Sequence, residues 1–116
     1  EIESAIVGVE GVAEAAVVGG DHEIKGEAVY AYVITEDGYE EDDTLRDRII
    51  EGVEDAIGPI ARPEKVVFTP ELPKTRSGKI MRRLLENIAN DDELGDTSTL
   101  RNPEIVDDIQ QAAGDD

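Results

Sequence analysis

The sequence contains no cysteine and no tryptophan, and aromatic residues make up only 3% of its 116 positions. The absence of cysteine excludes disulfide bonds, thiol catalysis and thiolate metal sites. There is also no apolar run near the roughly 18 residues that a membrane-spanning helix needs, so we expect no membrane partner. The core must therefore be built from Val, Ile, Leu and Ala, and the length suits a single domain with a modest core.

Positive charge is scarce as well. Lys and Arg number 11 against 29 Asp and Glu, which gives a net charge of −18. The acidic residues alternate with regularly spaced apolar ones, which favours a folded acidic surface and indicates a halophilic source. The same charge disfavours nucleic-acid binding. Because the chain opens in a helical pattern without Met or a signal sequence, we expect it to be a piece of a longer protein.

The spacing of apolar residues predicts a small α+β domain, with a three-stranded sheet flanked by helices and an extended C-terminal tail. We expect helices at residues 1–9, 45–57, 80–88 and 104–111, and strands at residues 12–18, 26–34 and 66–68. The second strand is apolar on both faces, which predicts a central position. Residues 19–21 (Gly-Gly-Asp) are expected to end the first strand. We assign residues 1–90 to the domain and residues 91–116 to the tail with its short helix.

One stretch departs from the acidic character of the chain. Residues 72–85 contain no Asp or Glu, and this absence indicates contact with an anion or with an acidic surface. Five of the 11 basic residues lie there within ten positions, namely Lys74, Arg76, Lys79, Arg82 and Arg83. Ser77 and Gly78 are turn residues, so Lys79 is expected where a flexible loop enters a helix whose free amides and dipole favour anions. The stretch is not a phosphate-binding P-loop, because the first glycine of that motif is missing and Ile80 replaces its Ser or Thr.

The run PKTRSGKIMRRLLENIA (residues 73–89) closely resembles the last signature motif of the adenylate-forming acyl-CoA synthetases, and within them the AMP-forming acetyl-CoA synthetases. Residues 15–33 resemble the segment that opens the small C-terminal domain of those enzymes. The run LGDTSTL (residues 94–100) followed by Asn-Pro resembles their C-terminal tail. The resemblance covers nearly the whole chain.

This resemblance implies that Lys79 is the adenylation lysine, supported in its loop by Ser77 and Gly78. The implied reaction joins acetate and ATP to acetyl-adenylate and pyrophosphate, and then transfers the acetyl group to coenzyme A. ATP, Mg²⁺ and coenzyme A are implied as substrates of the whole enzyme, with none bound tightly by this fragment, which we expect to be inactive alone. Also implied are a missing large N-terminal domain as partner, a cytoplasmic location, and silencing of Lys79 by a lysine acetyltransferase and its reversal by a deacetylase.

Other positions are weaker candidates. The basic residues Lys74, Arg76, Arg82 and Arg83 are predicted to contact nucleotide, coenzyme A or a modifying enzyme, or alternatively to dock on the acidic remainder of the enzyme. The family often carries an Arg near the 3′-phosphate of coenzyme A where this chain has Glu54. Either Arg62 substitutes for that Arg, or coenzyme A is held mainly by the missing part. His22, the only histidine, and Lys25 are expected to be exposed loop residues.

The resemblance also places a magnesium ion at the end of the first helix, on the backbone carbonyls of Val7, Val9 and Val12. Unpaired carbonyls at a helix C-terminus suit a hard cation. The family often has His at the position of Val9, so any side-chain ligand is lost here. An ordinary helix end is the alternative interpretation.

Two other functions stay open from the sequence. The domain could belong to a relative that acts on propionate or another short acid, or that feeds a carrier protein, since the acyl pocket lies outside this chain. It could also be a freestanding acidic module that captures a phosphate ligand with residues 74–83. Tight binding of ATP or coenzyme A by the isolated domain would favour the module.

Overall fold

A computed structural model describes residues 2–22, 26–90 and 92–114. The elements follow in the order α1 (Ile2–Val7), β1 (Val12–His22), β2 (Gly26–Thr35), α2 (Asp43–Ala56), a 3-10 turn η1 (Pro59–Ala61), β3 (Lys65–Phe68), α3 (Arg82–Ala89) and α4 (Ile105–Gly114). The arrangement confirms the predicted α+β class with a three-stranded sheet flanked by helices. None of the helices in the described ranges has the length and apolarity needed to cross a bilayer.

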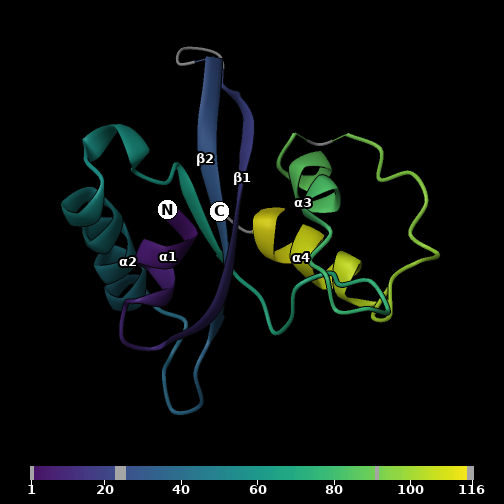
Figure 1. The fold of residues 1–116 in the computed structure, drawn as a ribbon, viewed down its shortest axis with the longest axis horizontal. Helices are drawn as coiled ribbons and strands as arrows, with labels where there is room; N and C mark the ends of the chain where they lie inside the picture. The colour runs from purple at the N-terminus through teal and green to yellow at the C-terminus, as the bar shows by residue number, and fades with distance from the viewer. Residues whose placement is uncertain (1, 23–25, 91, 115–116) are drawn as a thin grey trace.

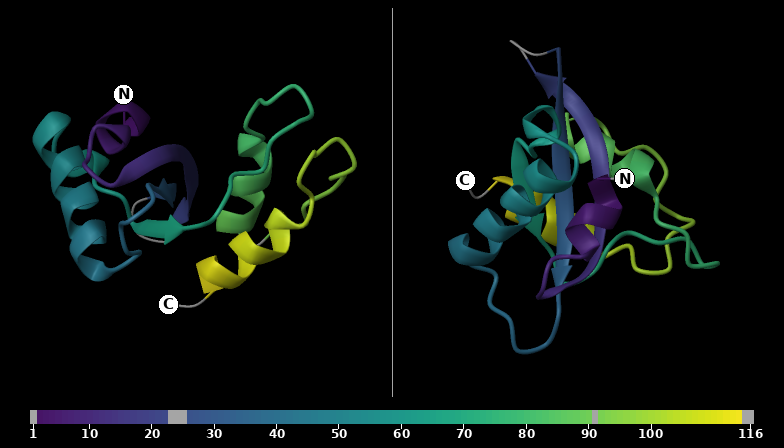
Figure 2. Two further views of the ribbon diagram at one scale, coloured as in Figure 1. Left: turned by 90° about the horizontal axis from the view of Figure 1, so that it is seen from below. Right: turned by 60° about the vertical axis from the view of Figure 1, so that its left-hand side comes forward.

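The sheet has the order β1-β2-β3, so the second strand is central, as its apolar faces predict. β1 pairs with β2 antiparallel, and β2 pairs with β3 parallel. A parallel pair needs a crossover, which α2 and η1 supply here. Figure 1 shows α1 and α2 on one face of the sheet and α3 and α4 on the other, and the left view of Figure 2 shows the same layers from below.

Side chains that alternate along β2 divide the core between the two faces, as strand geometry requires. Ala31 and Val33 are buried against α1 and α2, whereas Tyr32 is buried among residues of α3 and α4. The Tyr32 hydroxyl donates a hydrogen bond of 3.2 Å to the carbonyl of Leu85 in α3. Burial raises the pKa of Tyr32 well above its usual value, so this hydroxyl stays a donor. It ties the central strand to the helix that follows the basic stretch.

The expected end of β1 at residues 19–21 is wrong, because the strand continues to His22. Gly20 pairs with Ala28 in the ladder, and the ring of Tyr30 covers the place that a Cβ at residue 20 would take. The glycine therefore makes room for an aromatic ring on the neighbouring strand and does not break the strand. His22 closes the ladder opposite Gly26 and is not a loop residue, while Lys25 lies outside the described residues.

The tail turns back onto the domain. Its final helix begins at Ile105, close to the predicted start, but runs three residues beyond the predicted end to Gly114. Ile105 and Ile109 are buried in the core on the α3 face, and Leu100 and Val106 join Leu84 in a second, smaller cluster. The division of the chain at residue 90 stays a prediction, but the tail shares its buried surface with α3.

Candidate functional site: a braced hairpin carrying Lys79

The first part of the basic stretch, residues 73–81, forms a small hairpin between β3 and α3. Lys74 and Ile80 form an antiparallel bridge, and the amide of Met81 donates to the Pro73 carbonyl at 2.8 Å. Inside this base, the Thr75 amide donates to the Lys79 carbonyl at 2.8 Å and the Gly78 amide donates to the Thr75 carbonyl at 2.9 Å. The loop is therefore a closed turn whose two ends are held together by backbone hydrogen bonds.

Thr75 organises the tip. Its Oγ1 accepts from the Lys79 amide at 3.2 Å and lies 2.9 Å from the Ser77 hydroxyl. Gly78 has φ 91°, a left-handed conformation that L side chains rarely adopt. Ser77 and Gly78 thus act in the turn, as the sequence indicates. The helix begins at Arg82, two residues later than predicted, so Lys79 lies in the hairpin before the helix and not at its first turn. Its own amide is engaged by Thr75, and its exposed side chain is what the turn offers to a ligand.

The C-terminal tail braces this hairpin from outside. Leu100 forms an antiparallel bridge with Thr75, and the Arg101 amide donates to the Lys74 carbonyl at 3.0 Å. Next along the tail, the buried side chain of Asn102 donates from Nδ2 to the Leu72 carbonyl at 2.9 Å and accepts from the Lys74 amide at 3.1 Å. The orientation of Lys79 therefore depends on residues some twenty positions beyond it.

Three of the five predicted basic residues are held within the domain. Lys74 Nζ lies 2.8 Å from the Glu14 carboxylate on β1. Arg83 donates from Nη1 to the Leu94 carbonyl at 3.0 Å and from Nη2 to the Asp96 carbonyl at 3.4 Å. The Asp96 carboxylate in turn accepts from the Ser98 amide at 2.8 Å. Hydrogen bonds from the side chain and the backbone of Ser98 lower the pKa of Asp96. Arg83 thereby fixes the turn of the LGDTSTL run.

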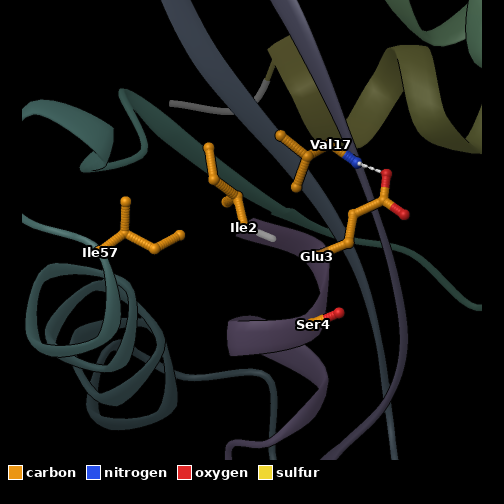
Figure 3. A pocket seen from close by; sticks show the side chains of 5 residues that line it. All are labelled: Ile2, Glu3, Ser4, Val17 and Ile57. Carbon is orange, nitrogen blue, oxygen red and sulfur yellow. Dashed lines mark hydrogen bonds between the residues drawn. The ribbon is translucent and has the colours of Figure 1, made fainter.

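The third held residue, Arg82, forms a two-pronged ion pair with Glu3 of α1. Arg82 Nη2 lies 2.6 Å from Glu3 Oε1, and Arg82 Nε donates to Glu3 Oε2 at 3.0 Å. The same carboxylate accepts from the amide of Val17 on β1 at 2.9 Å (Figure 3). The hydrogen bond from Arg82 is the main reason that the pKa of Glu3 falls below its usual value. The contact links the first helix to α3 across the outer strand of the sheet.

Arg76 and Lys79 differ from these three. Both side chains are exposed, and neither has an ion pair or side-chain hydrogen bond with any part of the chain that the structure describes. In a chain with 29 carboxylates, two cations without partners among the described residues are available for a ligand. The basic stretch therefore contains two kinds of residue. Lys74, Arg82 and Arg83 bind other parts of the chain, whereas Arg76 and Lys79 extend from the hairpin into solvent.

A separate pocket of about 510 Å³ lies between α1, β1 and the end of α2, lined by Ile2, Glu3, Ser4, Val17 and Ile57. In Figure 3 the side chains of Ile2, Val17 and Ile57 line one side of it, while the Glu3 carboxylate turns toward the Val17 amide. Of the lining residues that the structure describes, only Glu3 is ionisable, and it is already engaged by Arg82. Among the described residues, the pocket therefore holds no ionisable side chain that is free of a partner, and the hairpin remains the candidate site.

The other predicted site residues do not join the hairpin. Arg62 is exposed and follows η1, whose Ala61 is buried in the core on the α1 and α2 face. Its predicted contact with coenzyme A stays a prediction. In the turn after α1, the carbonyl of Val9 accepts from the Val12 amide at 3.2 Å, and Val7 is 46% exposed. The Val9 carbonyl therefore keeps one lone pair for a cation, and the magnesium position on Val7, Val9 and Val12 stays a prediction.

No group of three or more His, Asp or Glu side chains in the described ranges is arranged to hold a metal. Sequence reasoning also missed three residues at the hairpin: Thr75, Arg101 and Asn102. The signal for Asn102 was the pair Asn102-Pro103, a usual start of a helix. Arg101 and Thr75 have no local signal, because their roles depend on how the tail returns.

Comparison with known proteins agrees with this geometry. Residues 1–79 match the family described as the AMP-binding enzyme C-terminal domain. Acetyl-coenzyme A synthetases of Methylobacterium radiotolerans and Rhizobium rhizogenes are each 57% identical over 111 residues, which cover 94% of this chain and 17% of those proteins. The chain thus spans about a sixth of the length of the curated relatives it matches.

Solved structures show the same fold. The acyl-CoA synthetase of Brucella canis matches with a TM-score of 0.71 and 40% identity, over 74% of this chain and 16% of that protein. The ATP-bound MatB of Rhodopseudomonas palustris matches with a TM-score of 0.69 and 31% identity, over 78% of this chain and 17% of that protein. With its sheet, its helices and its Lys79 hairpin in place, this chain belongs to the family of AMP-binding enzyme C-terminal domains.

Proposed function

We propose that this chain is the C-terminal domain of an AMP-forming acetyl-CoA synthetase and that Lys79 is its adenylation lysine. The observation that carries the proposal is the exposed Lys79 ammonium, which has no partner in the described structure although the net charge is −18. It stands on a turn closed by backbone hydrogen bonds. The high identity to acetyl-coenzyme A synthetases supports acetate as the acid.

In the first half-reaction, a carboxylate oxygen of acetate attacks the α-phosphorus of ATP. The bond from that phosphorus to the bridging oxygen breaks, and pyrophosphate leaves with the bond's electrons. Negative charge builds on the equatorial oxygens while the phosphorus is five-coordinate. The Lys79 ammonium stabilises that charge as a compact point charge, which the planar guanidinium of an arginine would not reproduce.

In the second half-reaction, the sulfur of coenzyme A attacks the carbonyl carbon of acetyl-adenylate. The bond from that carbon to the phosphate oxygen breaks, AMP leaves with its electrons, and the thiol proton passes to solvent. No charge develops at an attacked phosphorus in this step, so Lys79 is not needed. The domain therefore serves adenylation in one pose and is rotated away for thioester formation. The large N-terminal portion that the relatives possess would hold ATP with its Mg²⁺, acetate and most of coenzyme A.

The exposure of Lys79 also supports regulation by acetylation. An acetyl group on Nζ removes the positive charge that adenylation requires, and a lysine acetyltransferase and deacetylase are the partners that this implies. Because ATP and coenzyme A are intracellular substrates, we place the enzyme in the cytoplasm.

The test is acetate-dependent ATP–pyrophosphate exchange by this chain joined to the N-terminal portion that its relatives possess. Lys79→Ala should lower the exchange rate by about a hundredfold or more, the usual effect of removing one preorganised charge. Lys79→Gln, which resembles acetyl-lysine, should do the same. Arg48→Ala on the exposed side of α2 is the control and should leave exchange unchanged. Exchange at the wild-type rate in Lys79→Ala would refute the assignment.

A further inference from the structure

The tail places a third unpaired cation at the tip of the Lys79 hairpin. Nη1 of Arg101 lies 4.0 Å from the position that a Cβ would take at Gly78, and no other atom lies as close to that position, apart from the immediate chain neighbours. Arg101 is held there by its main chain, because its amide donates to the Lys74 carbonyl and the preceding Leu100 bridges Thr75. The Arg101 guanidinium therefore lies beside the tip of the hairpin, although Arg101 follows Lys79 by 22 positions in the sequence.

Arg101, like Arg76 and Lys79, is exposed and makes no ion pair with the described portion of the chain. Among the described residues, the other arginines with neither an ion pair nor a side-chain hydrogen bond are Arg48 on α2 and Arg62 after η1. Neighbouring like charges repel one another, by an amount that depends on solvent exposure. No carboxylate of the described residues pairs with these three side chains, and backbone hydrogen bonds keep the hairpin and the tail together. An incoming anion would relieve the repulsion.

We propose that Arg101 is a phosphate-contacting residue that acts beside Lys79, an inference that rests on the proposed function. Its planar guanidinium can donate two parallel hydrogen bonds to phosphate oxygens, a geometry that the Lys79 ammonium cannot provide. The ligand is a phosphate ester or anhydride, either the polyphosphate chain of the nucleotide or the phosphates of coenzyme A. The tail thus supplies part of the ligand-binding surface as well as bracing it.

The test uses the complete enzyme with Arg101→Ala, Arg101→Lys and the control Arg48→Ala. The apparent KM values for ATP and pyrophosphate are measured in the exchange reaction, and the KM for coenzyme A is measured in thioester formation from supplied acetyl-adenylate. Loss of a charged hydrogen bond predicts a KM about tenfold higher in Arg101→Ala, with partial recovery in Arg101→Lys. The KM for acetate and the unfolding temperature should not change.

The two assays distinguish the phosphate source. A raised KM for ATP or pyrophosphate alone would identify the nucleotide, and a raised KM for coenzyme A alone would identify coenzyme A. Unchanged KM values in both assays would overturn the role of Arg101, even while Lys79→Ala still abolishes exchange. A Lys79→Ala enzyme that keeps exchange would instead refute the proposed function, so the two failures are distinct.

Discussion

The side-chain amide of Asn102 donates a hydrogen bond of 2.9 Å to the carbonyl of Leu72, so the C-terminal tail is joined to the segment that connects β3 to the hairpin. Its carbonyl oxygen simultaneously accepts from the Lys74 amide. One buried side chain thus satisfies two backbone groups at the base of the hairpin. The tail is therefore part of the support for Lys79.

This contact predicts the effect of Asn102→Asp. The carboxylate keeps an acceptor for the Lys74 amide but loses the donor, and it places negative charge beside the buried Leu72 carbonyl. Removing one partner of a buried hydrogen bond costs about 1–3 kcal/mol, so chemical denaturation should show a loss of that size. The control Gln110→Ala removes an exposed amide from α4 and should change the unfolding free energy very little. Equal stability of Asn102→Asp and the wild type would contradict the bracing role.

The Glu3–Arg82 pair predicts a pH dependence. The pKa of Glu3 is lower in the folded protein than its usual value of 4.5, so the carboxylate stabilises the fold above that pH. The contribution is lost as the pH falls through the folded pKa. Glu3→Gln should therefore lower the unfolding free energy near neutral pH by about 1 kcal/mol, since the pair is partly exposed.

The measurement is the difference in unfolding free energy between the wild type and Glu3→Gln, followed from neutral pH into acid. That difference should shrink as Glu3 becomes protonated. Glu51→Gln, on the exposed side of α2, serves as the control for simply removing one negative charge from an acidic protein. A difference that is independent of pH, or equal in the two variants, would argue against the ion pair as its source.

Gly78 offers a test of the turn itself. Its φ of 91° lies in the region that disfavours side chains, while the space around it is open apart from Arg101. Gly78→Ala should thus cost about 1 kcal/mol through backbone strain and not through collision. Gly78→Asn should cost less, because Asn tolerates left-handed conformations. If thermal unfolding ranks the two substitutions in the opposite order, the turn has a different backbone from the one described.

The net charge of −18 predicts that salt stabilises the domain. Repulsion between exposed carboxylates is screened as ionic strength rises. The unfolding temperature should therefore increase from dilute buffer to molar KCl, as expected for a halophilic protein. An unfolding temperature that stays constant or falls over that range would contradict the halophilic interpretation.

Much of the fold was predictable because it follows from apolar periodicity. The central strand is apolar on both faces, and the helix that follows the hairpin places Leu84 and Leu85 in the core. The end of β1 was not predictable, since two adjacent glycines usually mark a turn. Only the ring of Tyr30 on the neighbouring strand explains Gly20.

The sequence indicates where the candidate site lies, but it does not indicate which of its basic residues have partners within the domain. The stretch around Lys79 stood out because acidic residues are absent from it. The partners of Lys74 and Arg82 are Glu14 and Glu3, 60 and 79 positions away. No local pattern connects residues so distant, and the same holds for the approach of Arg101 to Gly78. Which cations are free is therefore a property of the folded chain alone.

If Lys79 serves adenylation alone, one variant should separate the two half-reactions. With the complete enzyme in molar KCl, Lys79→Ala is assayed for acetate-dependent ATP–pyrophosphate exchange and for thioester formation from supplied acetyl-adenylate. Exchange should fall by about a hundredfold or more while thioester formation continues at the wild-type rate. Equal loss of both activities, or survival of both, would contradict the role of Lys79 in adenylation alone.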